Sequence, residues 1–184
     1  DRAVSNFELF KNHVSVLFWS LGNESYAGDI LVEMNRYYKE KDPDRLVHYE
    51  GVAENRPYED LISDMESQMY APPEKIKEYL ENNPKKPFIL CEYMHDMGNS
   101  LGGMESYIRL LDQYEDYQGG FIWDYIDQAL FVKDEVTGRD VLRYGGDFDD
   151  RPSDYEFSGN GILFADRTEK PAMQEVRHYY GLRR

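Results

Sequence analysis

Short apolar runs alternate with amphipathic segments along the first two thirds of the chain. The apolar runs are rich in β-branched and aromatic side chains, as is typical of strands buried on both faces. The amphipathic segments repeat their apolar residues at helical spacing. The pattern predicts strands at 14–21, 46–49, 61–64, 87–92 and 119–124. It predicts helices at 3–11, 29–41, 74–82 and 103–114.

This alternation of strands and helices predicts βαβ units and a parallel sheet, and therefore an α/β fold. No Gly-rich dinucleotide fingerprint or phosphate loop follows a predicted strand, which disfavours a nucleotide-binding doubly wound fold. Polar side chains instead gather where strands end: Asn23, Glu24, Glu50, Tyr70, Glu92, His95, Trp123 and Asp124. In a (β/α)8 TIM barrel these ends form the catalytic face, so the pattern favours a barrel.

The number of predicted strands is too small for a complete barrel, which needs eight. Either the fold is an open sheet, or the chain is the C-terminal part of a barrel whose first strands lie upstream of Asp1. The chain begins without Met and within a helical pattern, so we expect a piece of a longer polypeptide. From Phe131 onward no helix alternates with strands, and 144–161 reads as loops and short extended pieces. We expect one catalytic-domain piece, with barrel strands at about 14–130 and post-barrel loops and a C-terminal segment at about 131–184.

Charge and composition narrow the range of partners. With 36 acidic and 21 basic residues the formal net charge is −15, which would repel nucleic-acid phosphates and anionic lipids. We therefore expect no nucleic-acid or membrane partner, and no apolar stretch is long enough to span a bilayer. The single cysteine, Cys91, excludes an internal disulfide and suits a reducing compartment. Neutral small molecules and metal cations fit this composition better.

Two glutamates, Glu24 and Glu92, stand at the ends of different predicted strands. In a barrel both carboxyl groups would point into one mouth, where two such groups cannot both ionise easily. Glycosidic bond cleavage needs one carboxylic acid that protonates the leaving oxygen and one carboxylate that attacks the anomeric carbon. The alternative from spacing alone is that each glutamate is a solvated strand-end residue.

Six sequence motifs along the chain indicate a family. They are VLFWSLGNES at 16–25, MYAPPE at 69–74, PFILCEYMHDMGNSLGG at 87–103, YQGGFIWDYIDQAL at 117–130, YGGDFDD at 144–150 and FSGNGILFADRT at 157–168. In this order they resemble the bacterial β-galactosidases of glycoside hydrolase family 2. The CEYMHDMGNS segment carries most of this resemblance, because related β-glucuronidases and β-mannosidases end this strand differently.

The resemblance implies a catalytic pair, with Glu24 as the general acid/base and Glu92 as the nucleophile. It implies that Asn23 hydrogen-bonds the sugar 2-hydroxyl, a contact that strengthens in the oxocarbenium-like transition state. Tyr70 would donate a hydrogen bond to Glu92 and hold it charged. His48 and Glu50 match no motif and are interpreted as structural.

The resemblance also implies a sugar-binding set and two metal ions. His95 would bind galactose hydroxyls, and Trp123 would pack against the apolar face of the sugar. Asn160 and the backbone carbonyl of Phe157 would belong to a Na⁺ site that touches the sugar 6-hydroxyl. Glu24 would also be one ligand of an active-site Mg²⁺, whose other ligands lie upstream.

The family pattern implies that the chain holds barrel strands four to eight with their following helices. The expected activity is that of a retaining β-galactosidase acting by double displacement, with the two carboxyl groups about 5–5.5 Å apart. We expect the rest of the parent polypeptide as a partner, a homo-oligomer, and a bacterial cytoplasmic location. We expect the chain alone to be a poor catalyst or none. The alternatives are a non-catalytic or complementing carbohydrate-binding fragment and a relative acting on another β-glycoside, such as a β-glucuronide.

Overall fold

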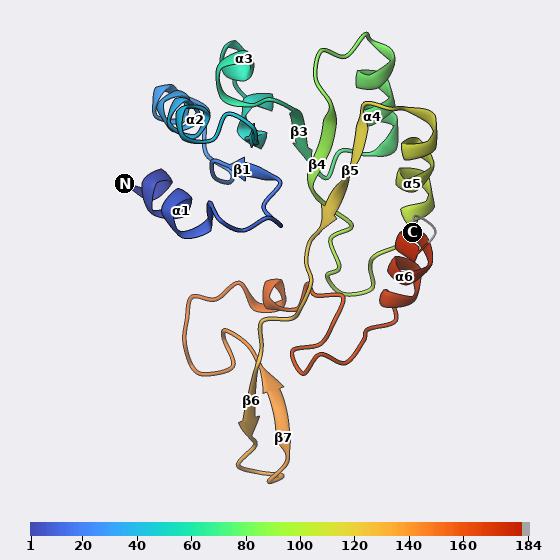
Figure 1. Ribbon diagram of the computed structural model, residues 1–184. Coiled ribbons are helices and arrows are strands. Elements are labelled where there is room, and N and C mark those ends of the chain that lie inside the picture. Colours follow the sequence, from blue (N-terminus) through green and yellow to red (C-terminus); the bar gives the residue numbers. More distant parts are fainter. Residues whose placement is uncertain (182–184) are drawn as a thin grey trace. The chain divides into compact units, whose positions relative to one another are not determined.

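The computed structural model describes residues 1–181, which form two compact units (Figure 1). The first unit comprises Asp1–Cys91 and Gln113–Gly119, and the second comprises Glu92–Asp112 and Gly120–Arg184. The expectation of one catalytic-domain piece with the boundaries given above stays a prediction.

The first unit alternates helices and strands, as the hydrophobic pattern predicts. Its elements are α1 (Arg2–Phe10), β1 (Phe18–Ser20), α2 (Asp29–Lys41), β2 (Leu46–His48), α3 (Glu59–Ile62), β3 (Glu66–Met69) and α4 (Pro73–Glu81), with 3-10 turns at Glu50–Ala53 and Arg56–Tyr58. β1 and β2 pair in parallel, with Trp19 opposite Val47. This pairing confirms the βαβ arrangement of β1, α2 and β2.

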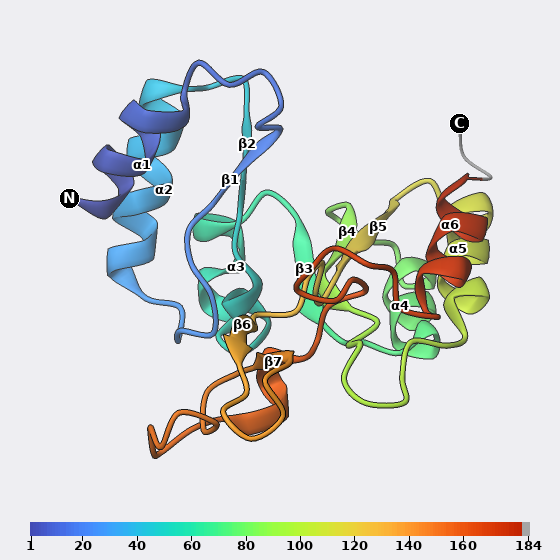
Figure 2. The ribbon, with the colours of Figure 1, turned by 90° about the horizontal axis from the view of Figure 1, so that it is seen from below.

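An aromatic cluster holds α1 and α2 against β1. Trp19 is buried and stacks on Tyr38 of α2 with 5.1 Å between ring centroids, while Phe7 of α1 lies 5.6 Å from Trp19. The Trp19 indole N–H donates to a carboxylate oxygen of Asp42 at 3.0 Å, so its one polar atom is satisfied. Figure 2 shows α1 and α2 side by side next to β1 and β2. This packing fixes the position of β1 and therefore the start of the turn that follows it.

A second sheet has the strand order β3-β4-β5. β4 (Phe88–Tyr93) and β5 (Tyr117–Ile122) each run from the first unit into the second. Phe88, Ile89 and Leu90 are all buried, which confirms the prediction of a strand covered on both faces.

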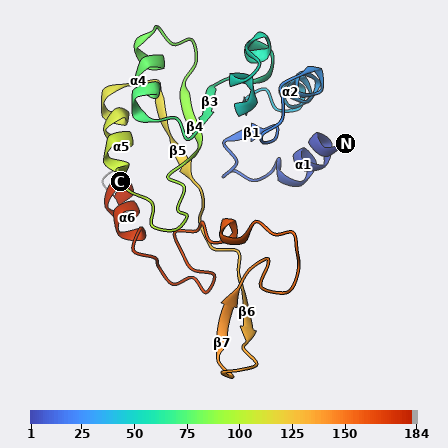
Figure 3. The same ribbon diagram turned by 180° about the vertical axis from the view of Figure 1, so that it is seen from behind.

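The second unit contains α5 (Met104–Gln113), β6 (Leu130–Lys133), β7 (Asp140–Arg143), a 3-10 turn at Tyr155–Ser158 and α6 (Met173–Gly181). β6 and β7 form an antiparallel hairpin, which Figure 3 shows from behind. The α6 residue Glu175 accepts the backbone N–H of Met104 at 2.9 Å, and Val176 joins Met104 in a small buried cluster. The prediction of loops at 144–161 is confirmed apart from the short turn, whereas α6 was not predicted.

The strand predicted at 61–64 is wrong. Residues 59–62 form α3, whose first turn carries Glu59 and Asp60, and acidic side chains favour a helix N-terminus. Ile62 is fully buried, so its apolar character reflects the helix core contact. The true strand, β3, reads Glu-Ser-Gln-Met. Its polar side chains are buried by hydrogen bonding, which hydrophobic patterning cannot detect.

The strand predicted at 14–21 is shortened to 18–20. The backbone N–H of His13 bonds to the Phe10 carbonyl, and that of Val16 bonds to the His13 carbonyl, so the segment turns. Val14 is 92 % exposed and Leu17 is 74 % exposed. The expectation of a strand buried on both faces therefore fails for the first half of this run.

Candidate functional site

A cavity of about 380 Å³ lies in the first unit where β1, β2 and β3 end. Its lining is Glu24, Glu50, Gly51, Ala53, Glu54, Gln68 and Met69. Three of these side chains are carboxylic acids and none is a cation, so we refer to this space as the acidic cavity.

Glu24 stands on a tightly held turn. Its backbone is left-handed, with φ of 50°, a conformation uncommon outside glycine. The N–H of Glu24 donates to Oε1 of Glu50 at 2.5 Å. The hydroxyl of Tyr49 accepts the N–H of Ser25 at 3.0 Å and donates to the Ser25 carbonyl. Glu24 and its neighbour Asn23 are exposed, so backbone contacts rather than burial hold this turn.

Glu50 is a chemical group that sequence reasoning missed. The residue is only 7 % exposed, and within the described residues its Oε2 has no hydrogen-bond partner. Burial raises the pKa of its carboxyl, while the hydrogen bond from the Glu24 N–H acts in the opposite direction. The available signal was position, because Glu50 directly follows the strand predicted at 46–49, and it lies two residues after the end of β2.

Tyr70 follows β3 directly and has a left-handed backbone, with φ of 53°. The side chain is 38 % exposed. It therefore stands at a strand end, as the sequence predicts. Its expected hydrogen bond to the nucleophile stays a prediction.

Beneath these strand ends, a hydrogen-bonded chain of side chains crosses three strands. His48 Nδ1 lies 2.9 Å from the Ser20 hydroxyl, and His48 Nε2 lies 2.6 Å from the Ser67 hydroxyl. Burial lowers the pKa of His48 to about 4, so the imidazole is neutral at pH 7. This agrees with the structural interpretation of His48.

The second unit holds Glu92, His95 and Trp123, all half-buried. The Trp123 N–H donates to the Tyr93 carbonyl at 3.0 Å, and the Trp123 carbonyl accepts the Asp96 N–H at 2.9 Å. These bonds tie the residue after β5 to the segment after β4. The predicted sugar-binding residues His95 and Trp123 are thus joined through the backbone.

Asp96 is a further group that sequence reasoning did not single out. It is 3 % exposed, and among the described residues its Oδ2 has no hydrogen-bond partner. Burial raises the pKa of its carboxyl, an effect that the positive charge of Lys170 opposes. It lies within the CEYMHDMGNS segment, but the resemblance described above gives it no role.

Asn160 and Phe157 are in contact in the second unit, while their role in a Na⁺ site stays a prediction. Asn160 is 1 % exposed, and its Nδ2 donates to the Phe157 carbonyl at 2.5 Å. The Phe157 ring lies 5.6 Å from the His95 ring. The Asn160 carbonyl accepts the N–H of Asp124 at 2.8 Å, so this loop is connected to the end of β5.

A close backbone approach fixes the loop after Asn160. A Cβ on Gly161 would lie 2.3 Å from backbone atoms of Ile126 and Asp127, which no other residue could accommodate without movement. Oδ1 of Asp127 accepts the Gly161 N–H at 2.9 Å and the Lys170 ammonium at 2.7 Å. The position of Asn160 is therefore set by the strand end beside it.

The oxygen atoms at Asn160 suit a hard cation after a small change. Asn160 Oδ1 is buried, and the described part of the chain offers it no partner. A half-turn of the amide would bring Oδ1 beside the Phe157 carbonyl, and such flips exchange two nearly identical groups. Two converging carbonyl oxygens fit Na⁺. For Mg²⁺ the resemblance names Glu24 as one ligand. Within residues 1–181 no group of three His, Cys, Asp or Glu side chains lies close enough together to hold a metal ion.

The sequence-predicted residues divide between the units. The first unit holds Asn23, Glu24 and Tyr70, and the second holds Glu92, His95, Trp123, Phe157 and Asn160. The separation of the Glu24 and Glu92 carboxyl groups stays a prediction.

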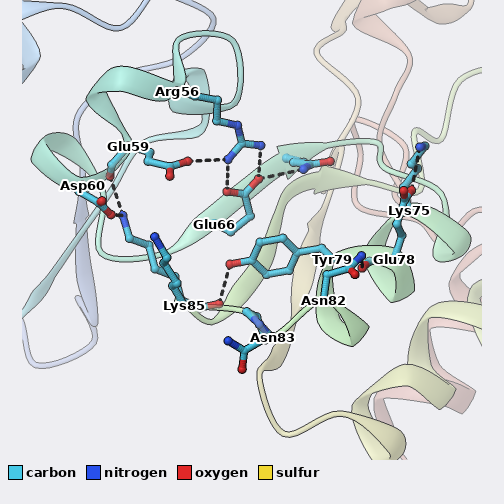
Figure 4. A pocket seen from close by; sticks show the side chains of 13 residues that line it. Arg56, Glu59, Asp60, Glu66, Lys75, Glu78, Tyr79, Asn82, Asn83 and Lys85 are labelled. Carbon is cyan, nitrogen blue, oxygen red and sulfur yellow. Dashed lines mark hydrogen bonds and ion pairs between the residues drawn. The ribbon is translucent and has the colours of Figure 1, made fainter.

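A second cavity in the first unit, of about 420 Å³, has a different character (Figure 4). Glu66, the first residue of β3, is buried and receives both nitrogens of the Arg56 guanidinium, at 2.6 and 2.9 Å. Arg56 also pairs with Glu59 at 3.0 Å, and Lys86 pairs with Asp60 at 3.1 Å. We refer to this space as the paired cavity, because its central charges all have partners.

No helix within residues 1–181 combines the length and apolar character needed to cross a bilayer.

Comparison with known proteins identifies the family. Residues 1–183 match the family described as "Glycosyl hydrolases family 2, TIM barrel domain". The chain belongs to glycoside hydrolase family 2. This confirms the resemblance seen in the six motifs, and it confirms the TIM-barrel class of this α/β chain at the level of the domain.

Curated relatives of this family 2 chain are close. It is 74 % identical over 181 residues to the "Beta-galactosidase large subunit" of Latilactobacillus sakei, covering 98 % of this chain and 29 % of the relative. It is 70 % identical over 182 residues to the "Beta-galactosidase large subunit" of Lactobacillus helveticus, covering 99 % and 29 %. The chain thus spans less than a third of the length of these relatives.

A solved structure supports the fold of the family 2 chain. The crystal structure of the family 2 β-galacturonidase from Eisenbergiella tayi, bound to galacturonate, matches 98 % of this chain and 35 % of that protein, with a TM-score of 0.61. The sequence identity is 15 %, so this likeness concerns the fold alone.

Proposed function

We propose that the protein is a retaining β-galactosidase that hydrolyses terminal β-D-galactosyl residues of lactose-type substrates, and that this chain forms strands four to eight of its barrel. The observation that carries the proposal is the 74 % identity to the large subunit of the Latilactobacillus sakei β-galactosidase over 98 % of the chain. The acidic cavity at three strand ends supports the proposal, because catalytic residues of TIM barrels come from those ends.

In the first half of the reaction, the Glu92 carboxylate attacks the anomeric carbon while Glu24 donates its proton to the glycosidic oxygen. The carbon–oxygen bond to the aglycone breaks, the alcohol leaves, and a covalent galactosyl ester forms on Glu92. The expected separation of the two carboxyl groups is about 5–5.5 Å, the retaining value.

In the second half, the Glu24 carboxylate takes a proton from water. The resulting nucleophile attacks the anomeric carbon, the ester bond to Glu92 breaks, and β-galactose is released. Glu24 ends the cycle protonated and Glu92 ends it ionised, so the enzyme returns to its starting state.

Four side chains would position the sugar and the nucleophile. We assign Asn23 to the 2-hydroxyl, where a contact gains strength in the transition state. Tyr70 donates a hydrogen bond to the Glu92 carboxylate. His95 binds galactose hydroxyls, and Trp123 packs against the apolar face of the ring, as aromatic side chains can.

We assign a Na⁺ ion to Asn160 Oδ1 and the Phe157 carbonyl, supported by the buried unpartnered amide oxygen. This ion would orient the 6-hydroxyl of the sugar. Glu24 would contribute one carboxylate to a Mg²⁺ ion, with other ligands from outside this chain.

The proposed partners are the rest of the parent polypeptide and a second, smaller subunit, because two close relatives are named as large subunits. A homo-oligomeric state and a cytoplasmic location in a bacterium remain part of the proposal. Nucleic acids and membranes are not proposed as partners, in line with the formal charge of −15.

The test is hydrolysis of 4-nitrophenyl β-D-galactoside by the full-length protein, with Mg²⁺ and Na⁺ present, beside 4-nitrophenyl β-D-glucuronide. We expect turnover of the galactoside, loss of that turnover in Glu92→Gln, and β-galactose as the first product seen by proton NMR. Preferred turnover of the glucuronide, or α-galactose as the first product, would contradict the proposal. The 184-residue chain alone is expected to show little or no turnover, which would agree with a complementing fragment.

A further inference from the structure

Three consecutive residues after β2 hold the turn that carries Glu24. Oε1 of Glu50 accepts the Glu24 N–H at 2.5 Å, and the Tyr49 hydroxyl binds both the N–H and the carbonyl of Ser25. Gly51 packs so closely that a Cβ there would lie 2.6 Å from the Ser25 carbonyl oxygen. The Glu24 N–H, the Ser25 N–H and the Ser25 carbonyl are thus all bound by residues 49–51.

The holding segment is buried, whereas the turn that it holds is exposed. Tyr49 is fully buried, and Glu50 and Gly51 are buried as well. Glu24 is exposed and has a left-handed backbone, a conformation that an L-residue keeps only when its surroundings impose it. The direction of the Glu24 side chain therefore depends on contacts from residues 49–51.

We propose that Tyr49 and Glu50 are positioning residues that aim the acid/base Glu24 at the leaving oxygen. This inference rests on the proposed function, in which Glu24 delivers that proton. Proton transfer needs the donor within hydrogen-bond reach of the glycosidic oxygen, and displacement of a catalytic group by about 1 Å can cost about a hundredfold in rate. Glu50 acts through its acceptor oxygen and the Glu24 backbone.

The contrast with Glu66 argues that Glu50 is more than a structural buried acid. Glu66 is satisfied on both oxygens by the Arg56 guanidinium. Glu50 is buried to a similar degree, yet its Oε2 has no partner within residues 1–181 and the side chain lines the acidic cavity. A buried acid that only supported the fold would be expected to have its charge paired.

The experiment measures kcat/KM of the full-length protein on two substrates that differ in their need for an acid. Methyl β-D-galactoside has an alcohol leaving group that must be protonated, whereas 2,4-dinitrophenyl β-D-galactoside releases a stable phenolate unaided. We expect Glu50→Met to lose about tenfold to a hundredfold on the methyl substrate and less than about threefold on the dinitrophenyl substrate. Tyr49→Phe, which removes one hydroxyl, should show the same split with about a threefold loss.

Three further variants make the result interpretable. Glu50→Gln should recover most of the methyl galactoside activity lost in Glu50→Met, because its amide oxygen can still accept the Glu24 N–H. Glu66→Met, a matched change of a buried glutamate in the paired cavity, should show no split between substrates. Glu24→Gln reports on the proposed function, since it must show the largest split if Glu24 is the acid.

The outcomes are separable. If Glu24→Gln shows the split and Glu50→Met and Tyr49→Phe do not, the positioning role is wrong while the proposed function stands. If Glu24→Gln shows no split, the acid/base assignment fails. Backbone hydrogen exchange provides a measurement independent of activity: peptides containing Glu24 and Ser25 should exchange faster in Glu50→Met and Tyr49→Phe than in Glu66→Met. Unchanged exchange would overturn the positioning role.

Discussion

The two cavities of the first unit have similar volumes, about 420 and 380 Å³, but they satisfy their charges in opposite ways. In the paired cavity the buried Glu66 carboxylate receives both nitrogens of Arg56 (Figure 4). In the acidic cavity the buried Glu50 carboxyl accepts one backbone N–H, and the described residues leave its other oxygen without a partner.

Both cavities include Gln68 of β3 in their lining, but their buried acids differ in position along the strands. Glu66 begins β3, whereas Glu24 and Glu50 follow the ends of β1 and β2. In TIM barrels the N-terminal ends of strands support stability and the C-terminal ends carry chemistry. From this difference we expect the unpaired buried acid after β2, rather than cavity size, to mark the catalytic side of this chain.

The largest expected difference between the cavities is in activity. Glu24→Gln should lower kcat on methyl β-D-galactoside by about a thousandfold, because general acid catalysis contributes on this order. Glu66→Gln, assayed at a temperature where the protein stays folded, should leave kcat within about twofold of the original, because Glu66 touches no proposed substrate group. Steady-state kinetics of the full-length variants measures both. Comparable losses in the two variants would remove the distinction between the cavities.

The next largest effect is on stability and belongs to the paired cavity. Arg56→Met leaves the Glu66 carboxylate buried without its cation, which should cost about 3 kcal/mol of unfolding free energy. Arg56 is itself partly exposed, so the lower end of the range for broken buried pairs applies. The urea midpoint of the full-length protein measures this, with kcat at 25 °C expected to hold. An unchanged midpoint would show that the pair contributes nothing.

The Ser20–His48–Ser67 chain joins the strands that carry both cavities, and it predicts a loss of stability in acid. Burial lowers the pKa of His48 from its ordinary 6.5 to about 4 in the folded protein. As pH falls, His48 therefore binds a proton in the unfolded chain before it does so in the folded protein. Its contribution to the free energy of unfolding is complete above pH 6.5 and declines toward pH 4. At pH 5 the loss should be about 2 kcal/mol.

Urea unfolding at pH 7 and pH 5 measures this loss, with His48→Gln as the comparison variant. The variant should show a smaller difference between the two pH values than the original protein. An equal difference in both proteins would assign the acid sensitivity to other groups.

A smaller effect concerns one methyl group beside the acidic cavity. Gly51→Ala places a Cβ 2.6 Å from both the Ser25 carbonyl oxygen and the Tyr49 ring, so the Glu24 turn or the tyrosine that holds it must shift. We expect kcat on methyl β-D-galactoside to fall about tenfold. Gly28→Ala is the matched control, because nothing lies within 4 Å of its added Cβ. Equal kcat in the two variants would show that the turn tolerates displacement.

The smallest effect is expected at the rim of the paired cavity. Lys75 and Glu78 form an ion pair at 2.8 Å on α4, but both side chains are mainly exposed. Exposed pairs of this kind contribute little, because water and salt screen them. Lys75→Ala should leave both the urea midpoint and kcat unchanged within error. A clear drop in the midpoint would mean that rim charges matter as much as the Arg56–Glu66 pair.

Hydrophobic patterning predicted the helices α1, α2, α4 and α5 and the strands β1, β2, β4 and β5, because these elements bury apolar side chains. Phe88, Ile89 and Leu90 of β4 show this directly. The pattern missed β3, whose Glu66 and Ser67 are buried through hydrogen bonds to side chains distant in sequence. It also missed α6, whose buried residue is Val176 alone, too little for a periodic signal.

The candidate site was predicted from motifs rather than from spacing. The placement of Glu24 after β1, Tyr70 after β3 and Asn160 beside the Phe157 carbonyl agrees with those expectations. Glu50 was interpreted as structural because it matches no motif, whereas the structure shows it in contact with the backbone of a residue 26 positions away. Such a contact depends on the register of β1 against β2 and on the turns that follow them, which the alternating pattern does not specify.

The measurement that tests the central claim most directly is covalent trapping of the nucleophile in the full-length protein. A 2-deoxy-2-fluoro-β-D-galactoside with a dinitrophenyl leaving group should form a stable ester, because the fluorine slows the second half of the reaction. Peptide mass spectrometry should place this label on Glu92, with no label in Glu92→Gln. A label on another residue, or full inactivation without any label, would contradict the assignment of Glu92 and with it the retaining mechanism.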